Sequence, residues 1–269
     1  MVYGIILLYY EKYADKSIKE FDDLLKKIDP NSKLIAISNS DSILASSCHL
    51  ISGDNQNWEF SGWDVGLSSI DKLNDSDVVI FCNDTFCHHN PWDDKIKKKF
   101  TRVFSRLINE NSRAPFLGIA GTTDCAWKEF SIDDKKFCNW ISSYLFLMTG
   151  SLLKKMNGSI CIDENRLDKY IHKDESDQII WNPSISQELQ RHLTQWIFGQ
   201  DKDSGWYNKN NISPEKKIRK IKTILNEKYL TAICNYYHGK VIEVKLAKRI
   251  KLFLWSSMSL LLKRIRHDK

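Results

Sequence analysis

The sequence predicts an α/β protein whose first strands are parallel. Residues 2–10 are apolar throughout, as expected of a strand buried on both faces of a sheet. Residues 16–28 place apolar side chains at a helical spacing, and Asp29-Pro30 ends that helix. Residues 33–38 form a second apolar run. Because a strand, a helix and a strand follow one another, we expect a parallel pair joined by a right-handed crossover.

The later elements follow from the same reading of side-chain spacing. A β-branched run from Val78 to Cys82 predicts a buried strand, because it is too short for a helix. Residues 200–212 are polar and turn-rich, and they predict a loop, a candidate lid with Trp206 as a sugar-stacking residue. The other expected strands cover 116–120 and 140–149, and the expected helices cover 64–72, 95–109, 150–153, 183–199, 214–229 and 243–266.

Composition narrows the class of protein. The chain has 269 residues, of which 42% are hydrophobic and 28% charged, the balance of a soluble globular domain. Its seven cysteines include no CxxC pair, which favours reduced cytosolic thiols over a disulfide framework. The first residues lack a basic leader before the apolar run, so we expect no signal peptide. No uncharged run reaches the length of a membrane span.

Charge is distributed unevenly along the chain. From Pro214 onward there are 15 Lys/Arg and 4 Asp/Glu, a net charge of +11. The other 25 Lys/Arg and 30 Asp/Glu give residues 1–213 a net charge of −5. We therefore expect a domain over 1–213 and a basic helical tail over 214–269. Such asymmetry indicates an anionic partner surface, either a membrane or a nucleic acid.

The tail contains an apolar stretch with cations at both ends. The 11 residues from Leu252 to Leu262 are uncharged, which is too short to span a bilayer. Lys and Arg flank both ends of the stretch, and Trp255 lies inside it. This pattern is typical of a helix that lies in a membrane interface. The alternative is a helix that docks its apolar face on the domain or on a second subunit.

Polar residues follow the predicted strands at the edge where open α/β sheets bind ligands. Asn83-Asp84-Thr85 come directly after the Val78 strand, and Tyr9 and Asn39 end the first two strands, where a base and ribose bind. Asp84 can hold a divalent cation, which can hold a diphosphate. The alternative is a plain turn. The fingerprint GxGxxG is absent, which argues against an ordinary dinucleotide fold.

Thiols and imidazoles near this loop raise a second possibility. Cys82, Cys87, His88 and His89 lie close together in the sequence, as zinc ligands do. Their spacing matches no common zinc module, and Cys82 belongs to the strand. Contact of His88 or His89 with a phosphate is a further alternative.

Four segments occur in an order that resembles a known family. They are FSGWDVGL from Phe60, NDT from Asn83, PFLGIAGTTD from Pro115 and WISSYLFLMTGSLL from Trp140. This order is similar to the rhamnan synthesis protein F family of bacterial glycosyltransferases over roughly residues 2–240. More broadly it resembles the GT-A fold, a nucleotide-sugar-binding mixed sheet flanked by helices. Asn83 departs from the Asp that usually opens the acidic motif, and Ser142 replaces a Gln.

The resemblance implies roles on the donor side of a site. Asp84 would bind Mg²⁺ or Mn²⁺, with Asn83 beside it. Tyr9 and Asn39 would lie near the nucleotide. The donor pocket would be shaped by Gly62, Trp63 and Asp64, although the tryptophans of this segment can equally be core anchors.

On the acceptor side the resemblance implies a carboxylate, either Glu188 or Asp124. Glu188 falls in the first turn of a helix that Ser186 can cap, and it is the candidate base. Its alternative role is a first-turn carboxylate stabilised by the helix dipole. Asp124 can bind sugar or acceptor hydroxyls, and its alternative role is a turn carboxylate.

The implied function is transfer of a sugar from a nucleotide-diphosphate donor to a growing bacterial surface polysaccharide or a lipid-linked glycan. The implied location is the cytoplasm, at the inner face of the membrane, with the tail on anionic lipid. One alternative is a non-catalytic relative that only binds glycan or a partner, since Asn83 weakens the metal motif. Another is a nucleic-acid-binding protein that uses the basic tail. No RNA- or DNA-binding signature appears, so we expect no nucleic-acid partner.

Overall fold

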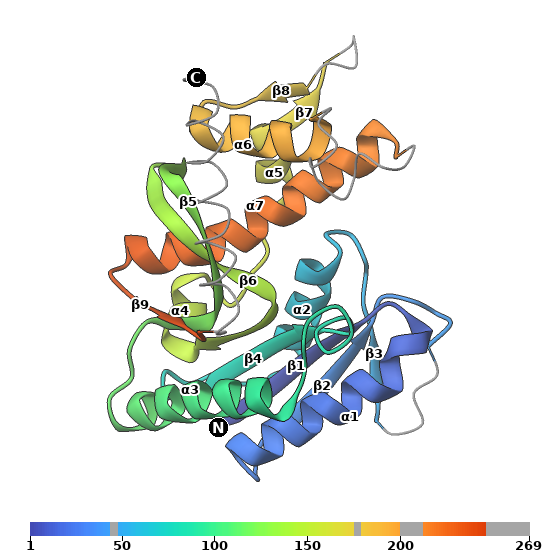
Figure 1. Ribbon diagram of the computed structural model, residues 1–269, viewed down its shortest axis with the longest axis vertical. Helices are drawn as coiled ribbons and strands as arrows, with labels where there is room; N and C mark the ends of the chain where they lie inside the picture. Colours follow the sequence, from blue (N-terminus) through green and yellow to red (C-terminus); the bar gives the residue numbers. More distant parts are fainter. Residues whose placement is uncertain (44–47, 175–178, 200–211, 246–269) are drawn as a thin grey trace, which may run out of the picture.

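The computed structural model describes residues 1–43, 48–174, 179–199 and 212–245, and over these ranges the protein is α/β (Figure 1). A seven-stranded mixed sheet runs in the order β3-β2-β1-β4-β6-β5-β9, beside a two-stranded sheet of β7 and β8. The strands are β1 (Val2–Leu8), β2 (Lys33–Ser38), β3 (Leu50–Ser52), β4 (Val78–Asn83), β5 (Gly118–Ile132), β6 (Lys135–Thr149), β7 (Ile171–Lys173), β8 (Ile179–Trp181) and β9 (Lys240–Glu243). The helices are α1 (Glu11–Ile28), α2 (Glu59–Ser68), α3 (Asp94–Arg113), α4 (Gly150–Lys155), α5 (Glu164–Tyr170), α6 (Gln187–Phe198) and α7 (Pro214–Tyr236).

The four strands β3, β2, β1 and β4 are parallel, as predicted for the first strand–helix–strand unit. In the register, Ile5 of β1 lies between Ile35 of β2 and Phe81 of β4. Because these strands are parallel, their carboxyl ends meet at one edge of the sheet. The predicted α/β class is therefore confirmed, with an edge of the kind that binds ligands.

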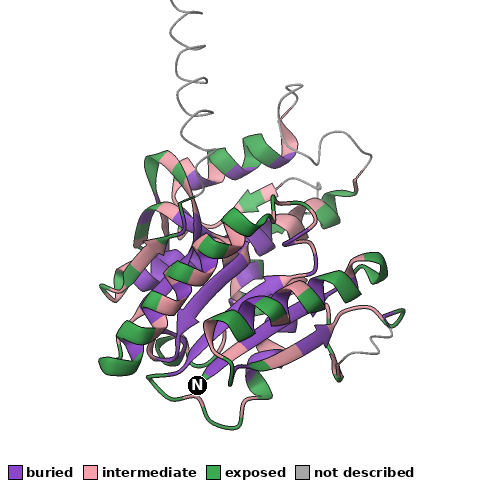
Figure 2. Ribbon diagram, turned by 60° about the horizontal axis from the view of Figure 1, so that its bottom comes forward, coloured by how far each residue is buried: buried purple, intermediate pink, exposed green. Residues whose placement is uncertain are grey.

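Helices cover both faces of this sheet, and the burial pattern of Figure 2 follows from that. Strand residues alternate between the two faces. Ile6 and Ile80 pack under α1 and α3, with Phe21 and Phe104. Phe81 and its neighbours pack on the opposite face, under α2, α4 and α7. Strands covered on both sides have no solvent face, so their sequences are apolar throughout.

Strands β5 and β6 form a long antiparallel hairpin that continues past the end of β4. The β4–β6 ladder is antiparallel and stops at Cys82 opposite Leu145, so residues of β6 before Leu145 extend beyond the carboxyl end of β4. The far half of the hairpin packs with α5, α6 and α7 around a second apolar cluster that includes Phe130, Leu189 and Leu225. Figure 1 shows this upper part stacked on the sheet.

The expected boundary after residue 213 is wrong for the described part of the tail. Helix α7 buries Leu225 and Leu230 in the clusters above, and Lys240 of β9 pairs with Gly118 in the main sheet. Glu243, the expected first residue of the last helix, instead ends strand β9. Both elements therefore belong to the folded body. The rest of the expected tail, 246–269, lies outside the described residues.

Smaller differences concern where elements begin and end. The helix expected over 64–72 is α2 and begins at Glu59, and the helix expected from residue 16 is α1 and begins at Glu11. The strand expected over 116–120 extends to Ile132 because its hairpin partner β6 continues the ladder. Within the described ranges, no helix is both long and apolar enough to cross a membrane.

Candidate functional site

Charged side chains from the carboxyl end of β4, the start of α2 and α7 act on one another, and the region that these three elements border is called the crevice. Ser143 of β6 is the second residue past the end of the β4 ladder. Its backbone N–H and its hydroxyl both donate to Oε2 of Glu227, at 2.8 and 2.6 Å. Helix α7 therefore holds a carboxylate directly beyond the strand end. Lys220, two helical turns earlier, lies on the same face of α7.

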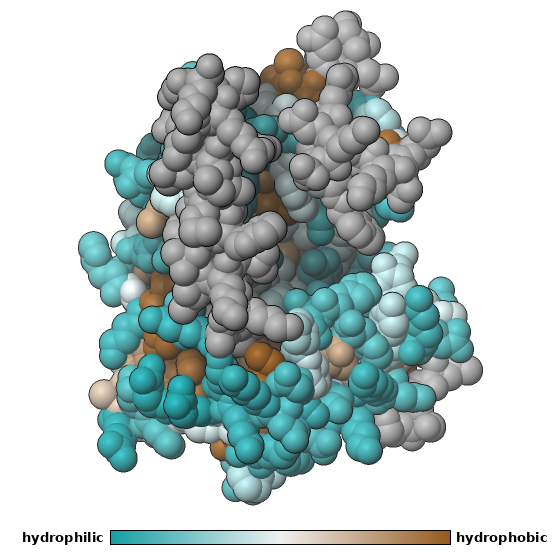
Figure 3. Space-filling view, viewed as in Figure 1, coloured by the Kyte–Doolittle hydropathy of each residue, from teal (hydrophilic) through white to brown (hydrophobic). Residues whose placement is uncertain are grey.

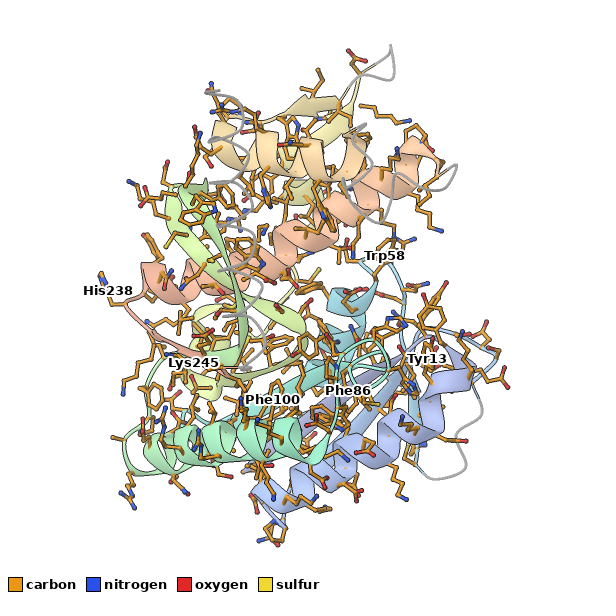
Figure 4. All side chains as sticks on the ribbon, in the orientation of Figure 1. Tyr13, Trp58, Phe86, Phe100, His238 and Lys245 are labelled. Carbon is orange, nitrogen blue, oxygen red and sulfur yellow. The ribbon has the colours of Figure 1, made fainter. Side chains whose placement is uncertain are left out.

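Glu59, the first residue of α2, faces the same crevice. The charged groups that act on its carboxyl are Lys220 and Glu227 of α7 and Asp84 at the end of β4. Burial raises the pKa of Glu59, the two carboxylates raise it further, and Lys220 opposes them. Trp58 places Glu59 there, because its backbone has a positive φ of 51° that turns the chain sharply into the helix. Figure 4 shows Trp58 between α2 and α7.

Two tyrosines border the crevice at the end of β1. Tyr9 is 48% exposed and Tyr10 is 42% exposed, and their rings meet edge to face. Burial raises the pKa of the Tyr10 hydroxyl, and the carboxylates of Asp84 and Glu59 add to that rise. The sequence placed Tyr9 at a strand end, and the structure confirms that position. Exposed aromatic rings beside polar groups suit a base or a sugar ring.

Asp84 lies where the sequence predicted, at the end of β4, but its carboxyl is directed into the protein. It is only 2% exposed. Its Oδ2 accepts from the backbone N–H groups of Tyr9 and Tyr10, at 2.7 and 2.6 Å. Its own carbonyl accepts from the Ser17 hydroxyl. Burial raises the pKa of Asp84, and the two amides oppose that rise. The residue thus fixes the turn between β1 and α1.

Asp84→Ala is expected to lower the free energy of unfolding by about 3 kcal/mol, because two amides lose a charged acceptor in a buried place. Asp84→Asn is the matched control. It keeps the shape and one acceptor oxygen, so we expect a loss of about 1 kcal/mol. Urea unfolding of the three proteins measures both values. Equal stability of the alanine variant and the unchanged protein would show that the turn does not depend on this carboxylate.

The residues present do not fit a divalent cation held by Asp84. A hard cation needs several oxygens that are free to turn toward it. One oxygen of Asp84 already serves two amides, and Oε2 of Glu227 serves Ser143. We therefore derive no chemical step through a metal at Asp84.

The cysteines and histidines near Asp84 are likewise used in packing. Cys82 is buried in the cluster under α1 and α3. Cys87 lies 3.6 Å from the Ser17 hydroxyl. His88 stacks on the Tyr13 ring at 4.2 Å, and His89 meets the edge of that ring. Among the described residues, these side chains form no group of three that could hold a metal ion, so the structure gives no support to the zinc alternative.

Asn39 and Gly62 both contribute to the close packing of α2 on the sheet. The Asn39 amide donates to the Trp58 carbonyl at 2.9 Å and so holds the chain that leads into α2. A side chain at Gly62 would begin 2.3 Å from Leu7 and 3.1 Å from the Asn39 oxygen. Gly62 is therefore required for the close packing of α2 on the sheet. Gly62 is thus buried by this packing, whereas the side-chain oxygen of Asn39 has no hydrogen-bond partner in the described structure.

Trp63 and Asp64 also turn away from the expected donor pocket. Trp63 is fully buried among Phe60, Phe81 and Phe146, and its indole N–H donates to the Cys82 carbonyl at 2.9 Å. Trp63 is thus a core anchor, the alternative that the sequence left open. Asp64 accepts from the backbone N–H of Ile160 at 2.7 Å, and burial raises its pKa. Its function is to hold the chain after α4.

Asn83 and Asp124 remain near the crevice. The Asn83 oxygen accepts from the hydroxyl of Thr85 at 2.8 Å, which stabilises the turn. Asp124 lies opposite Trp140 in the β5–β6 ladder and accepts from the Ser142 hydroxyl at 2.9 Å. The serine that replaces the expected Gln thus contacts the second expected site residue.

Glu188 is not brought to this crevice. It lies in the first turn of α6, as predicted, and pairs with Arg191 at 2.7 Å. Figure 1 shows α7 between α6 and the strand ends. The expectation that Glu188 serves the same site as Asp84 is therefore not met, and the helix-start alternative describes its contacts. Trp206 and the expected lid over 200–211 lie outside the described residues.

Lys228, next to Glu227, is a second charged group near the crevice that is as enclosed as Asp84. It is 2% exposed, and its Nζ lies 2.9 Å from the centre of the Trp140 ring. Burial lowers the pKa of Lys228 to about 7, although Glu227 and Asp124 favour its charged form. Burial also lowers the pKa of His192, with a further contribution from Lys228. The amine of Lys228, which lies next to the crevice, can therefore gain or lose a proton near neutral pH.

Sequence reasoning missed Glu59, Glu227 and Lys228. Glu59 precedes Gly62, and the sequence pattern predicts a helix only from residue 64, so it gives Glu59 no helical position. Lys228 belongs to the stretch that the charge distribution predicts as a basic tail, although its neighbours Leu225, Leu230 and Ile233 lie at the spacing of a buried helix. That spacing was the available signal, because a helix with apolar residues on several sides is buried.

The chain matches no protein-family model, and a search of curated proteins finds no relative.

Proposed function

We propose that this protein is a glycosyltransferase with a GT-A-like fold, which transfers a sugar from a nucleotide-diphosphate donor to a bacterial surface polysaccharide or lipid-linked glycan. One observation carries the proposal. Exposed aromatic rings, carboxylates and cations converge at the carboxyl ends of parallel strands, where α/β sheets bind their ligands. The order of the four sequence segments supports the particular reaction.

Two cations suit the diphosphate of the donor. Arg219 and Lys220 of α7 both lie over the Trp58 ring, at 5.6 and 5.4 Å from its centre. Arg219 donates to the Asn55 carbonyl, and its Nε is buried without a hydrogen-bond partner in the described structure. Cations on the crevice wall can neutralise a leaving diphosphate in the way a metal does elsewhere. This supports donor binding without a metal on Asp84.

The acceptor side needs a base, and Glu59 suits that role better than Glu188. In the proposed step the acceptor hydroxyl oxygen bonds to the anomeric carbon, and its proton passes to the Glu59 carboxylate. The bond from the anomeric carbon to the diphosphate oxygen breaks, and the diphosphate leaves with the electron pair. Asp124 and Ser142 can hold other hydroxyls of the acceptor. A carboxylate with a raised pKa is a stronger base than an ordinary glutamate.

A donor screen tests the proposal. The purified chain is incubated with a panel of nucleotide sugars, with Mn²⁺ or with EDTA, and release of nucleoside diphosphate is measured with and without oligosaccharide acceptors. We expect release with at least one donor, and we expect it to persist in EDTA. A chain that binds donors or glycans but never releases the nucleotide is instead a non-catalytic binding relative.

We also propose that the chain works in the cytoplasm at the inner face of the bacterial membrane, held by residues 246–269. This segment carries seven Lys/Arg against one Asp, and each cation near an anionic leaflet contributes about 1 kcal/mol. Removal of 246–269 is expected to weaken binding to anionic liposomes by at least about 100-fold and to leave transfer to a soluble acceptor unchanged. Sedimentation with liposomes measures this. Undiminished binding would contradict it, and an insoluble truncated chain would favour the docking alternative.

A further inference from the structure

The outer face of α3 carries a continuous row of cations. Its members are Lys95, Lys98, Lys99, Arg102, Arg106 and Arg113. Their spacing of three, four and seven residues places them on one side of the helix. The opposite side buries Phe100, Phe104 and Leu107 against the sheet. The helix orientation is thus fixed by the core, and the cationic row is held outward. Figure 3 shows hydrophilic side chains over this part of the molecule.

Few acidic groups neutralise this row. Arg106 lies 3.8 Å from Glu110, and both side chains are well exposed, so the pair contributes little. Lys97, which points to the side, is the lysine that pairs with Glu20 of α1, at 2.6 Å. In the described residues, Lys98 and Arg102 have no carboxylate within ion-pair distance. Their charge is available to a partner.

The surface between these cations is hollowed. One shallow depression is lined by Lys27 at the end of α1 and by Lys97, Lys98 and Arg102, together with Asp94 and Thr101. A second lies beside it and adds Lys95 and Lys99. Open depressions lined by several cations suit compact anions such as phosphate groups. They do not suit a large apolar ligand, which needs a deep apolar pocket.

The chain leaves the described body at the same place. Nζ of Lys99 donates to the carbonyl of Lys245 at 2.9 Å, so the last described residue lies against α3 (Figure 4). Residues 246–269, with seven Lys/Arg and one Asp, follow directly. The basic row and the start of the basic segment therefore lie on one side of the molecule.

We propose that the outer face of α3 is a docking surface for the anionic headgroups of a membrane. This extends the proposed membrane association from 246–269 to the folded body, and it does not depend on sugar transfer. A lipid surface is favoured over a single-stranded nucleic acid by the absence of stacking rings on this face. In the described ranges, the large exposed apolar and aromatic residues all lie outside α3. Proteins that bind single strands combine cations with such rings.

The test uses the full chain and vesicles of phosphatidylcholine and phosphatidylglycerol in equal parts. The double substitution Lys98→Gln and Arg102→Gln is expected to weaken vesicle binding about 30-fold, since each lost cation costs about fivefold. The control, Lys128→Gln with Lys169→Gln, removes two exposed charges from β5 and α5 and should change binding less than about threefold. All four positions are exposed, and thermal unfolding verifies that both variants are folded.

Three outcomes would overturn the proposal. One is an equal loss in the two double variants, which would indicate net charge alone. Another is displacement from vesicles by inorganic phosphate at constant ionic strength, which would assign the depressions to free phosphate. The third is DNA binding that is tighter than vesicle binding and lost in the α3 variant. Retained vesicle binding without any sugar transfer would leave this proposal standing and count against the glycosyltransferase alone.

Discussion

Lys228→Met is expected to raise the free energy of unfolding by about 4 kcal/mol at about pH 6, and by far less at about pH 10. The physical reason is the cost of burying an ammonium group. Lys228 is 2% exposed between the Trp140 and Phe130 rings. The face of Trp140 attracts the charged form, but burial outweighs it and lowers the pKa to about 7. Methionine has a similar volume and no charge to bury.

The dependence on pH follows from proton binding. In the unfolded chain the amine keeps its proton up to the ordinary lysine value of 10.5, whereas in the folded chain it releases it near 7. Between these values the unfolded chain binds more protons, so the stability of the natural protein rises with pH across that window. Below about pH 7 the full cost is present. The methionine variant lacks this rise, so its advantage shrinks as pH increases.

Urea unfolding at about pH 6, 8 and 10 measures the difference between the two proteins, and other titrating groups cancel in that difference. Lys169→Met on the exposed side of α5 is the control, for which we expect a difference near zero at each pH. A Lys228→Met variant that is less stable than the natural protein in the acidic sample would show that the ammonium is held by its neighbours Asp124 and Glu227, and that its charge supports the fold.

The sequence correctly predicts those strands and helices whose assignment depends only on the spacing of apolar residues. The run from Val78 to Cys82 is a strand buried on both faces, and its sequence indicates this burial because every residue in it is apolar. The spacing of α1 and α3 likewise predicted helices with one apolar side. In such cases the partner of each side chain need not be known, because any apolar partner gives the same pattern.

Side-chain direction at the site was not predictable in this way. A Trp beside a Gly has the same sequence whether its ring enters the core, as Trp63 does, or a pocket. A carboxylate after a strand has the same sequence whether its oxygens meet a ligand or two backbone amides, as in Asp84. These outcomes depend on the β1–α1 turn that packs beside β4, which is distant in sequence. The same holds for β9, whose short edge pairing with β5 has no local signature.

Glu59→Gln is expected to lower turnover about 10²–10⁴-fold while donor affinity stays nearly unchanged, because it removes the proposed base and keeps the shape of the crevice. Glu188→Gln is the matched control. Glu188 pairs with Arg191 on α6, beyond α7, so we expect nearly full turnover.

The dependence of turnover on pH separates a base from a structural carboxylate. Burial and the nearby carboxylates of Glu227 and Asp84 raise the pKa of Glu59, so the active, ionised form is lost at a higher pH than for an ordinary glutamate. Turnover of the natural protein should therefore fall as pH falls through that raised pKa. Turnover of the Glu59→Gln variant should not show this fall. If the turnover of the Glu59→Gln variant still falls at acidic pH, or if its donor affinity and turnover fall equally, Glu59 is not the base. A large loss of turnover in the Glu188→Gln variant would instead assign the base role to Glu188 of α6.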